Sequence, residues 1–220
     1  LTILAGAISQ YGFSPLVVTL GQRGPFHHLL DQKGINNIHL DLRRHPISGI
    51  FRLATAILRA RPMLIHSFLF WGNLGGKILH IATGIPLIMS QRSTDDWKTP
   101  LHWHAEYFPP RLSAAVVSNS SAGIRALRAH THIPKARIYF IPNGISFTHL
   151  EQGKANKTFY GFPEDVTIIG SVGNLRPPKG FDHFLKAARI IAEHRPATMF
   201  AIAGEGPERP RLERLAAELG

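Results

Sequence analysis

The 220-residue sequence contains no cysteine. Disulfide bonds and thiolate metal sites are therefore excluded, and their absence is compatible with the reducing cytoplasm. Acidic residues are scarce, because 14 Asp and Glu stand against 25 Lys and Arg, for a net charge of +11 at pH 7. Such an excess of positive charge suggests anionic partners: nucleic acid, acidic lipid surfaces or phosphorylated small molecules.

No long uninterrupted hydrophobic run is present. The most apolar region, residues 63–89, is interrupted by histidine, asparagine and lysine, so we do not expect it to span a membrane. Nothing at the N-terminus resembles a signal peptide. The chain begins with "LTILAGAISQYG", which reads as a helix already under way, so we expect a segment of a longer protein.

Short apolar runs alternate with helical patterns along the chain. Most runs are apolar on both faces, which is typical of parallel strands covered by helices. The alternation predicts an α/β fold with doubly wound parallel sheets. The predicted strands are residues 16–20, 38–42, 63–67, 86–91, 114–119, 137–141, 166–172 and 198–203, and the predicted helices are residues 25–33, 48–60, 73–83, 120–130, 180–194 and 207–219.

A polar, weakly periodic stretch, residues 148–164, follows "YFIPNGI" and precedes a new strand. We interpret it as a linker, so that residues 1–147 form a first domain and residues 148–220 begin a second. Asn143 and Gly144 are a turn pair after a proline. They are either a plain turn or the hinge between the domains.

The stretch "GNLRPPKGFDHFLKAA", residues 173–188, places two cations between a predicted strand and a predicted helix. Gly173 lets an anion approach the backbone closely, Arg176 offers a fork of donors, and Lys179 offers a point charge. The helix N-terminus adds the positive end of a dipole, and two prolines stiffen the loop. The stretch therefore suits a phosphate group. The alternative is a surface loop with solvated cations.

A second glycine loop follows the next strand, in "FAIAGEGPERPRL", residues 200–212. Gly204, Glu205 and Gly206 form most of a dinucleotide fingerprint, but its third glycine is missing because position 209 is Arg. The loop is either a second backbone cradle beside the first or an ordinary tight turn between a strand and a helix. Two such loops on neighbouring parallel strands could line one cleft.

The strand in "LIMSQRSTDDW", residues 87–97, ends in Ser90, Gln91 and Arg92. Active sites are built at such strand ends, although a surface loop is the alternative reading. His66 ends another apolar run, and we interpret it more readily as a satisfied core histidine than as a site residue.

Two His-x-His pairs, His102 with His104 and His130 with His132, invite a metal interpretation. On a helix the two members of each pair point to different faces, and neither pair has carboxylate or cysteine support. We therefore expect no metal site.

Taken in order, these motifs resemble the family-4 retaining glycosyltransferases, which have the GT-B fold of two Rossmann-like domains. "IPNGIS", "GNLRPPKG" and "GEGPER" lie where the family has "NGID", "GRL...KG" and "GxGP". "RPMLIHSFLFWGNLGGKILHIATGIPLIMSQRS" and "VVSNSSAGIRAL" are similar to segments of the family's acceptor-side domain. The resemblance covers essentially the whole chain and is most specific in residues 137–212.

The resemblance implies roles for individual residues. Those that match the donor diphosphate site are Gly173, Arg176 and Lys179, and those that match the loop facing the sugar nucleotide are Gly204, Glu205 and Gly206. Arg92 is a candidate catalytic residue, because some members resemble "SxR" there while many carry a histidine. Ser146 stands where an aspartate is usual. The family's first strand and glycine-rich loop would precede residue 1, and its Glu–seven residues–Glu motif would follow residue 220.

The resemblance also implies a function. We expect transfer of a sugar, with retention, from a nucleotide-sugar donor to a glycan or lipid-linked acceptor, without cofactor or metal ion. We also expect a cytoplasmic location, with peripheral contact between the protein and an anionic membrane. We expect no nucleic-acid partner. The alternatives are a nicotinamide-dependent oxidoreductase, against which the incomplete glycine fingerprint counts, and a basic nucleic-acid-binding module, against which the spread of the cations along the chain counts.

Overall fold

The computed structural model describes residues 1–144 and 157–220. The chain divides into two compact units, Leu1–Ile145 and Ser146–Gly220. The sequence places the boundary between residues 147 and 148, and the candidate hinge residues Asn143 and Gly144 lie at the end of the first unit. Ser146 falls outside the described residues, as does part of the expected linker.

The first unit opens with a two-stranded parallel sheet, in which β1 (Leu16–Thr19) pairs with β2 (Asn36–His39). Its helices are α1 (Thr2–Ile8) and α2 (Pro25–Gln32). A small buried core joins these elements: Ala5, Val17, Leu30 and Ile35. Strand β2 begins earlier than the sequence predicts because its first two residues are asparagines, which interrupt the apolar pattern.

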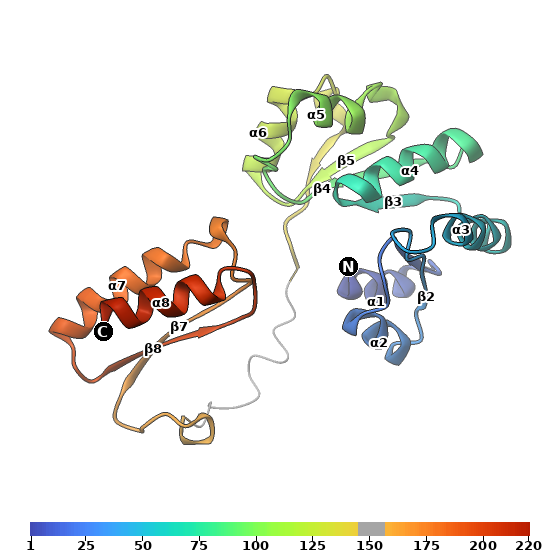
Figure 1. Ribbon diagram of the computed structural model, residues 1–220. Helices are drawn as coiled ribbons and strands as arrows, with labels where there is room; N and C mark the ends of the chain where they lie inside the picture. Colours follow the sequence, from blue (N-terminus) through green and yellow to red (C-terminus); the bar gives the residue numbers. More distant parts are fainter. Residues whose placement is uncertain (145–156) are drawn as a thin grey trace. The chain divides into compact units, whose positions relative to one another are not determined.

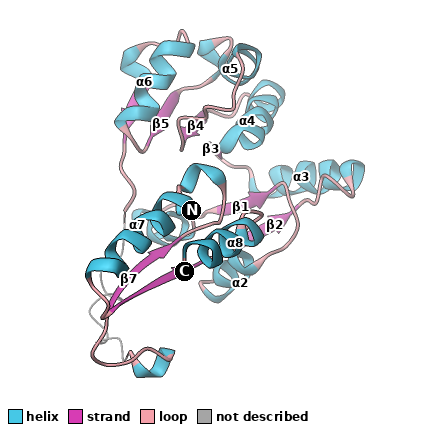
Figure 2. Ribbon diagram, turned by 60° about the vertical axis from the view of Figure 1, so that its left-hand side comes forward, coloured by secondary structure: helices cyan, strands magenta, loops and turns pink. Residues whose placement is uncertain are grey.

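After α3 (Pro46–Ala60) comes a four-stranded parallel sheet in the order β3-β4-β5-β6. Figures 1 and 2 label the first three of these strands. Its strands are β3 (Ile65–Phe68), β4 (Leu87–Gln91), β5 (Ala115–Ser118) and β6 (Ile138–Phe140). Its helices are α4 (Leu69–Thr83), α5 (Pro100–Tyr107) and α6 (Ser121–His130). The core of this part consists of Leu87, Met89, Trp103, Tyr107, Val116, Leu127 and Ile133. Central strands are apolar on both faces because helices cover the sheet.

Helix α5 has no counterpart among the predicted helices. Its buried face consists of Trp103, Glu106 and Tyr107. A buried charge between two aromatic residues does not produce an apolar helical period, so the sequence pattern fails there. Helix α4 also begins earlier than predicted, at Leu69, whose backbone is left-handed with φ 66°.

The second unit has two parallel strands, β7 (Thr167–Val172) and β8 (Thr198–Ala203), paired along their whole length. Helices α7 (Phe181–His194) and α8 (Arg209–Leu219) lie side by side next to them (Figure 1). Leu175, Phe181 and Leu212 form its buried core, with Leu185 and Ile202 packed against them. Across the described part of the chain, no helix combines the length and the apolar character needed to cross a bilayer.

Candidate functional site

The two loops that follow β7 and β8 are joined through their backbones. The Gly173 N–H donates to the Ala203 carbonyl at 3.0 Å, which continues the strand pairing beyond β7. The Leu175 N–H then donates to the Glu205 carbonyl at 2.9 Å, and the Glu208 N–H donates to the Leu175 carbonyl at 3.1 Å. Leu175 itself is buried in the core of the unit. The two glycine loops therefore form one connected layer at the carboxyl ends of both strands.

Close approach of the two loops explains the glycines of the second. A Cβ at Gly204 would lie 1.9 Å from the Gly173 carbonyl oxygen, and a Cβ at Gly206 would lie 2.3 Å from the Leu175 carbonyl oxygen. Neither position has room for a side chain, because the obstacle is backbone. The Gly-x-Gly pattern thus has a packing role in holding the loops together, whatever else it contacts.

We expect Gly204→Ala to lower the free energy of unfolding by about 1–3 kcal/mol, the usual cost of overpacking. Gly170→Ala in β7 is the matched control, because a Cβ there would meet its nearest neighbour, the Ala201 carbonyl oxygen, at an ordinary 3.7 Å. The control should be as stable as the unsubstituted protein, or slightly more stable. Urea unfolding of the three proteins tests this. Equal stability of both variants would contradict the close approach.

Arg176 and Lys179 flank and end a short 3-10 turn, Pro177–Lys179. The turn is closed by Gly180, whose φ of 66° is in the left-handed region that favours glycine. Both cations are exposed, and within residues 1–144 and 157–220 neither forms an ion pair or a side-chain hydrogen bond. The backbone that carries them is stiffened by two prolines, so the attachment points of the two charges are restricted while the charges are not neutralised.

The N-terminus of α7 is partly engaged by its own side chain. Desolvation opposes ionisation of Asp182, but the charge of His183 and the backbone N–H groups of His183 and Asp182 together lower the pKa of this carboxyl. Some of the N–H donors at this helix end are therefore already used by Asp182. An anion at this end would have to share those donors with Asp182.

Glu205 is tied to the start of α8. Its carboxylate pairs with Arg209, which also pairs with Glu213 at 2.8 Å. Arg209 occupies the position where a full dinucleotide fingerprint has its third glycine. The pair is exposed, so it contributes little to stability. Glu205 remains accessible, in the loop that the resemblance assigns to the sugar nucleotide.

The strand ends of the first unit bring together residues that lie far apart in the sequence. His66 Nε2 lies 2.8 Å from the Ser90 hydroxyl oxygen, and the Arg92 guanidinium donates to the Asn143 side-chain oxygen. The candidate catalytic residue thus contacts the candidate hinge residue. The interpretation of His66 as a core histidine is wrong, because His66 is exposed on β3.

Desolvation, and secondarily the positive charge of Arg92, lower the pKa of His66 from 6.5 to about 4. His66 is therefore neutral at pH 7. Because its folded pKa lies below its unfolded pKa, its contribution to stability is complete above about pH 6.5 and is lost as the pH falls toward the folded pKa.

We expect the His66 ring, followed by NMR, to titrate well below pH 6.5, and Arg92→Gln to raise its midpoint because a nearby positive charge is removed. Between pH 7.5 and pH 5, the unsubstituted protein should lose more stability than His66→Gln. An unchanged His66 midpoint in Arg92→Gln would contradict the contact between these strand ends.

A buried polar cluster lies behind the β4–α5 loop. Lys98 Nζ lies 2.5 Å from Asp95 and 2.5 Å from Glu106, and both the Lys98 and Glu106 side chains are fully buried. Asn73 on α4 donates to Glu106 at 2.6 Å, and Gln91 donates to Asp95 at 2.9 Å. These contacts fix the loop that begins with Arg92. Sequence reasoning missed Lys98 and Glu106, because nothing local distinguishes them from surface charges.

Three of the four histidines in the two His-x-His pairs pack against aromatic rings. His102 lies among aromatic rings, His104 stacks on Phe108, and His130 stacks on Trp103. Among the residues that the structure describes, no group of three or more His, Cys, Asp or Glu is placed to hold a metal ion.

The fold of this chain is similar to that of solved structures, a glycosyltransferase among them. HepE of Anabaena, in its complex with UDP-glucose, has the same fold with a TM-score of 0.80, at 18% identity over 99% of this chain and 61% of that chain. A glycosyltransferase of Rickettsia africae has a TM-score of 0.74, at 17% identity over 99% of this chain and 60% of that chain. The expected GT-B fold is thereby confirmed.

Among curated proteins, the alpha-D-kanosaminyltransferase of Streptomyces kanamyceticus is 28% identical over 140 residues, 61% of this chain and 35% of that protein. The chain thus spans about a third of this relative and about 60% of the solved structures. The family model for Glycosyltransferase Family 4 matches residues 1–149, and that for Glycosyl transferases group 1 matches residues 153–220. The chain therefore belongs to the family-4, group 1 glycosyltransferases.

Proposed function

We propose that the protein to which this chain belongs transfers a sugar from a nucleotide-sugar donor to a glycan or lipid-linked acceptor, with retention of the anomeric configuration. The observation that carries the proposal is the pair Arg176 and Lys179, exposed, without ionic partners among the described residues, and fixed on a proline-stiffened turn. Negative charge grows on the departing diphosphate as the glycosidic bond breaks. Fixed cations stabilise this charge without reorganising, and they can do so without a metal ion.

The glycine loop after β8 supports the same assignment. It is joined to the cationic loop by backbone hydrogen bonds, and it presents the exposed Glu205 beside it. A sugar nucleotide has a diphosphate for the first loop and polar hydroxyl groups for the second. HepE of Anabaena, which shares the fold, binds UDP-glucose in its solved structure.

The role of Arg92 belongs to the same proposal. It lies at the carboxyl end of β4, the edge of a parallel sheet where ligands bind, and its guanidinium is oriented by Asn143. We assign it to the acceptor side. The net charge of +11 is compatible with a peripheral contact between the cytoplasmic enzyme and an anionic membrane that carries the acceptor.

The test is a transfer assay with the complete enzyme and a panel of nucleotide sugars. Release of nucleoside diphosphate should need one donor, should persist in EDTA, and should give a product whose anomeric configuration, read by NMR, matches that of the donor. The isolated 220-residue chain should show weak turnover or none. Inversion, loss of activity in EDTA, or full turnover by the isolated chain would each contradict a part of the proposal.

A further inference from the structure

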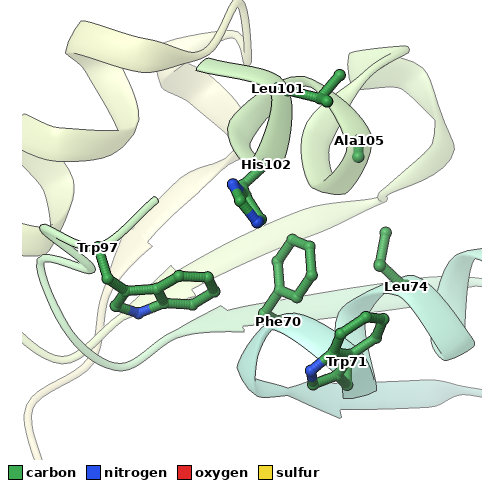
Figure 3. A pocket seen from close by; sticks show the side chains of 7 residues that line it. All are labelled: Phe70, Trp71, Leu74, Trp97, Leu101, His102 and Ala105. Carbon is green, nitrogen blue, oxygen red and sulfur yellow. The ribbon is translucent and has the colours of Figure 1, made fainter. Parts of the chain in front are cut away.

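A cavity of about 250 Å³ lies in the first unit (Figure 3). For comparison, a cavity of about 150 Å³ is wide enough to hold benzene. The pocket can therefore take one ring or a short chain. Its lining comes from α4, from the β4–α5 loop and from α5: Phe70, Trp71, Leu74, Trp97, Leu101, His102 and Ala105.

The walls of this pocket are aromatic and aliphatic. Phe70, Trp97 and His102 meet edge to face, with ring centroids 5.3–5.5 Å apart. The Nδ1 atom of His102 is engaged by the Thr99 hydroxyl at 2.7 Å. Among the residues that the structure describes, no carboxylate, amide, hydroxyl, ammonium or guanidinium side chain lines the pocket. Buried sugar hydroxyls would find few partners there and would be penalised, whereas an apolar group would be favoured.

The pocket is held open by the buried polar contacts behind it. Asn73 on α4 donates to Glu106 on α5 at 2.6 Å. Lys77 on α4 donates to the carbonyls of Ala105 and Phe108 at 2.6 and 2.8 Å. These bonds fix the two helices that form the walls. Because the walls are fixed in advance, little order is lost when a ligand enters.

The rim exposes large apolar side chains at a cost to the fold. Trp71 is 72% exposed and Leu101 is 74% exposed, and Leu69, which precedes the pocket residue Phe70 in the chain, is 66% exposed. Leu69 also has a left-handed backbone with φ 66°, and so does Asp95, with φ 55°, on the loop that carries Trp97. Left-handed backbone in non-glycine residues stores strain that is typical of binding and active sites. Exposed apolar patches of this kind mark interaction surfaces.

The pocket shares its segments with the strand-end cluster, by which we mean His66, Ser90, Arg92 and Asn143. Residues 66–71 carry both His66 and the first wall, and residues 92–97 carry both Arg92 and Trp97. A molecule whose polar end reaches the cluster is thus placed to put an apolar part into the pocket. We propose that this pocket binds the apolar part of the acceptor, and that the acceptor is lipid-linked rather than a free glycan. The inference rests on the proposed transfer to an acceptor on this unit.

The test uses octyl glucoside that carries a bromine on the alkyl chain, kept below its critical micelle concentration. The chain has three tryptophans: Trp71 and Trp97 line the pocket, and Trp103 is 3% exposed beneath it. We expect saturable quenching of tryptophan fluorescence, with shifts of the Trp71 and Trp97 indole N–H signals and none for Trp103.

Ala105→Phe fills part of the pocket and should weaken this binding about tenfold. That factor is expected when about two methylene groups of the alkyl chain can no longer be buried and stay in water. Ile50→Ser removes a comparably exposed apolar residue from α3 and should leave binding unchanged. Circular dichroism of both variants shows whether they fold as the unsubstituted protein does. Should Ala105→Phe misfold, Leu101→Ser on the rim replaces it, with the same expected direction.

Four results would overturn the inference. Equal binding by Ala105→Phe and the unsubstituted protein would place the probe elsewhere. Maltose shifting the same indole signals would indicate a sugar subsite, and quenching by vesicles alone would indicate a membrane contact. Protection of Trp71 and Trp97 from acrylamide in the complete enzyme would show that protein already covers the pocket. UDP-sugar binding, measured separately, distinguishes these results from failure of the proposed transferase function.

Discussion

Replacing Arg176 or Lys179 by alanine in the complete enzyme is expected to lower the rate of sugar transfer about 100-fold while leaving the fold almost unchanged. Both residues are exposed, and neither has an ionic partner among the described residues, so their loss removes no folding contact. Loss of one fixed donor to a developing charge costs on the order of 3 kcal/mol in the transition state. A solvated surface cation would change stability by only about 0.5 kcal/mol, with no effect on rate.

The measurement compares donor turnover and melting temperature for both variants. Arg214→Ala is the control, because Arg214 is an equally exposed cation on α8. It should turn over normally. Near-normal turnover in both the Arg176 and Lys179 variants would show that the two residues are ordinary surface charges. The proposed donor site would then lose its strongest support.

Lys98→Met is expected to lower the free energy of unfolding by about 3–5 kcal/mol, the usual cost of leaving one member of a buried ion pair alone. Glu106 would keep a fully buried carboxylate without its counter-ion. The Lys98 ammonium also lies 4.4 Å from the centre of the Trp103 ring, and that contact would be lost as well. Because the cluster supports the β4–α5 loop, the apolar pocket should loosen too.

A double variant separates this effect from general disruption. Lys98→Met with Glu106→Gln should recover much of the lost stability, since a neutral amide keeps the bond from Asn73 without a buried charge. Arg209→Met, which breaks two exposed ion pairs, should cost no more than about 1 kcal/mol. Urea unfolding of these variants measures their free energies of unfolding and so tests these expectations. If the single Lys98 variant were as stable as the Arg209 variant, the buried cluster would not support the loop.

The cluster also predicts a dependence on pH. Burial opposes ionisation of Asp95, but hydrogen bonds from Lys98, Ser93 and Gln91 and the charge of Lys98 together lower the pKa of this carboxyl. A folded pKa below the unfolded value of about 3.8 gives stability that is present above that pH and is lost as the pH falls further. In Lys98→Met this acid-dependent loss should shrink.

The elements that sequence reasoning identified have a local signature. Strands β7 and β8 are continuous apolar runs, and each ends at a glycine loop, so both the strands and the loops were found. The elements that it missed depend on contacts between distant residues. From the sequence alone, nothing distinguishes Glu106 from a surface charge. Only the folded structure brings Lys98 and Asn73 into contact with it. The side-chain hydrogen bond between Arg92 and Asn143 joins residues that are 51 positions apart, so no local sequence pattern predicts it.

The same distinction applies to the candidate site. The spacing of Arg176 and Lys179 was visible in the sequence, but the engagement of the α7 N-terminus by Asp182 was not. The aromatic pocket likewise requires α4 and α5 to lie together. A side chain that meets its partner only after folding leaves no periodic trace in the sequence.

We propose that the joined glycine loops of the second unit bind the diphosphate of a sugar nucleotide. The most direct test of this proposal is thermal stabilisation of the complete enzyme by a panel of UDP, GDP and ADP, together with NADH and duplex DNA. We predict that one nucleoside diphosphate raises the melting temperature, that NADH and DNA do not, and that the increase disappears in the Arg176→Ala/Lys179→Ala double variant. Stabilisation by NADH or DNA alone, or an equal increase in the double variant, would contradict the account.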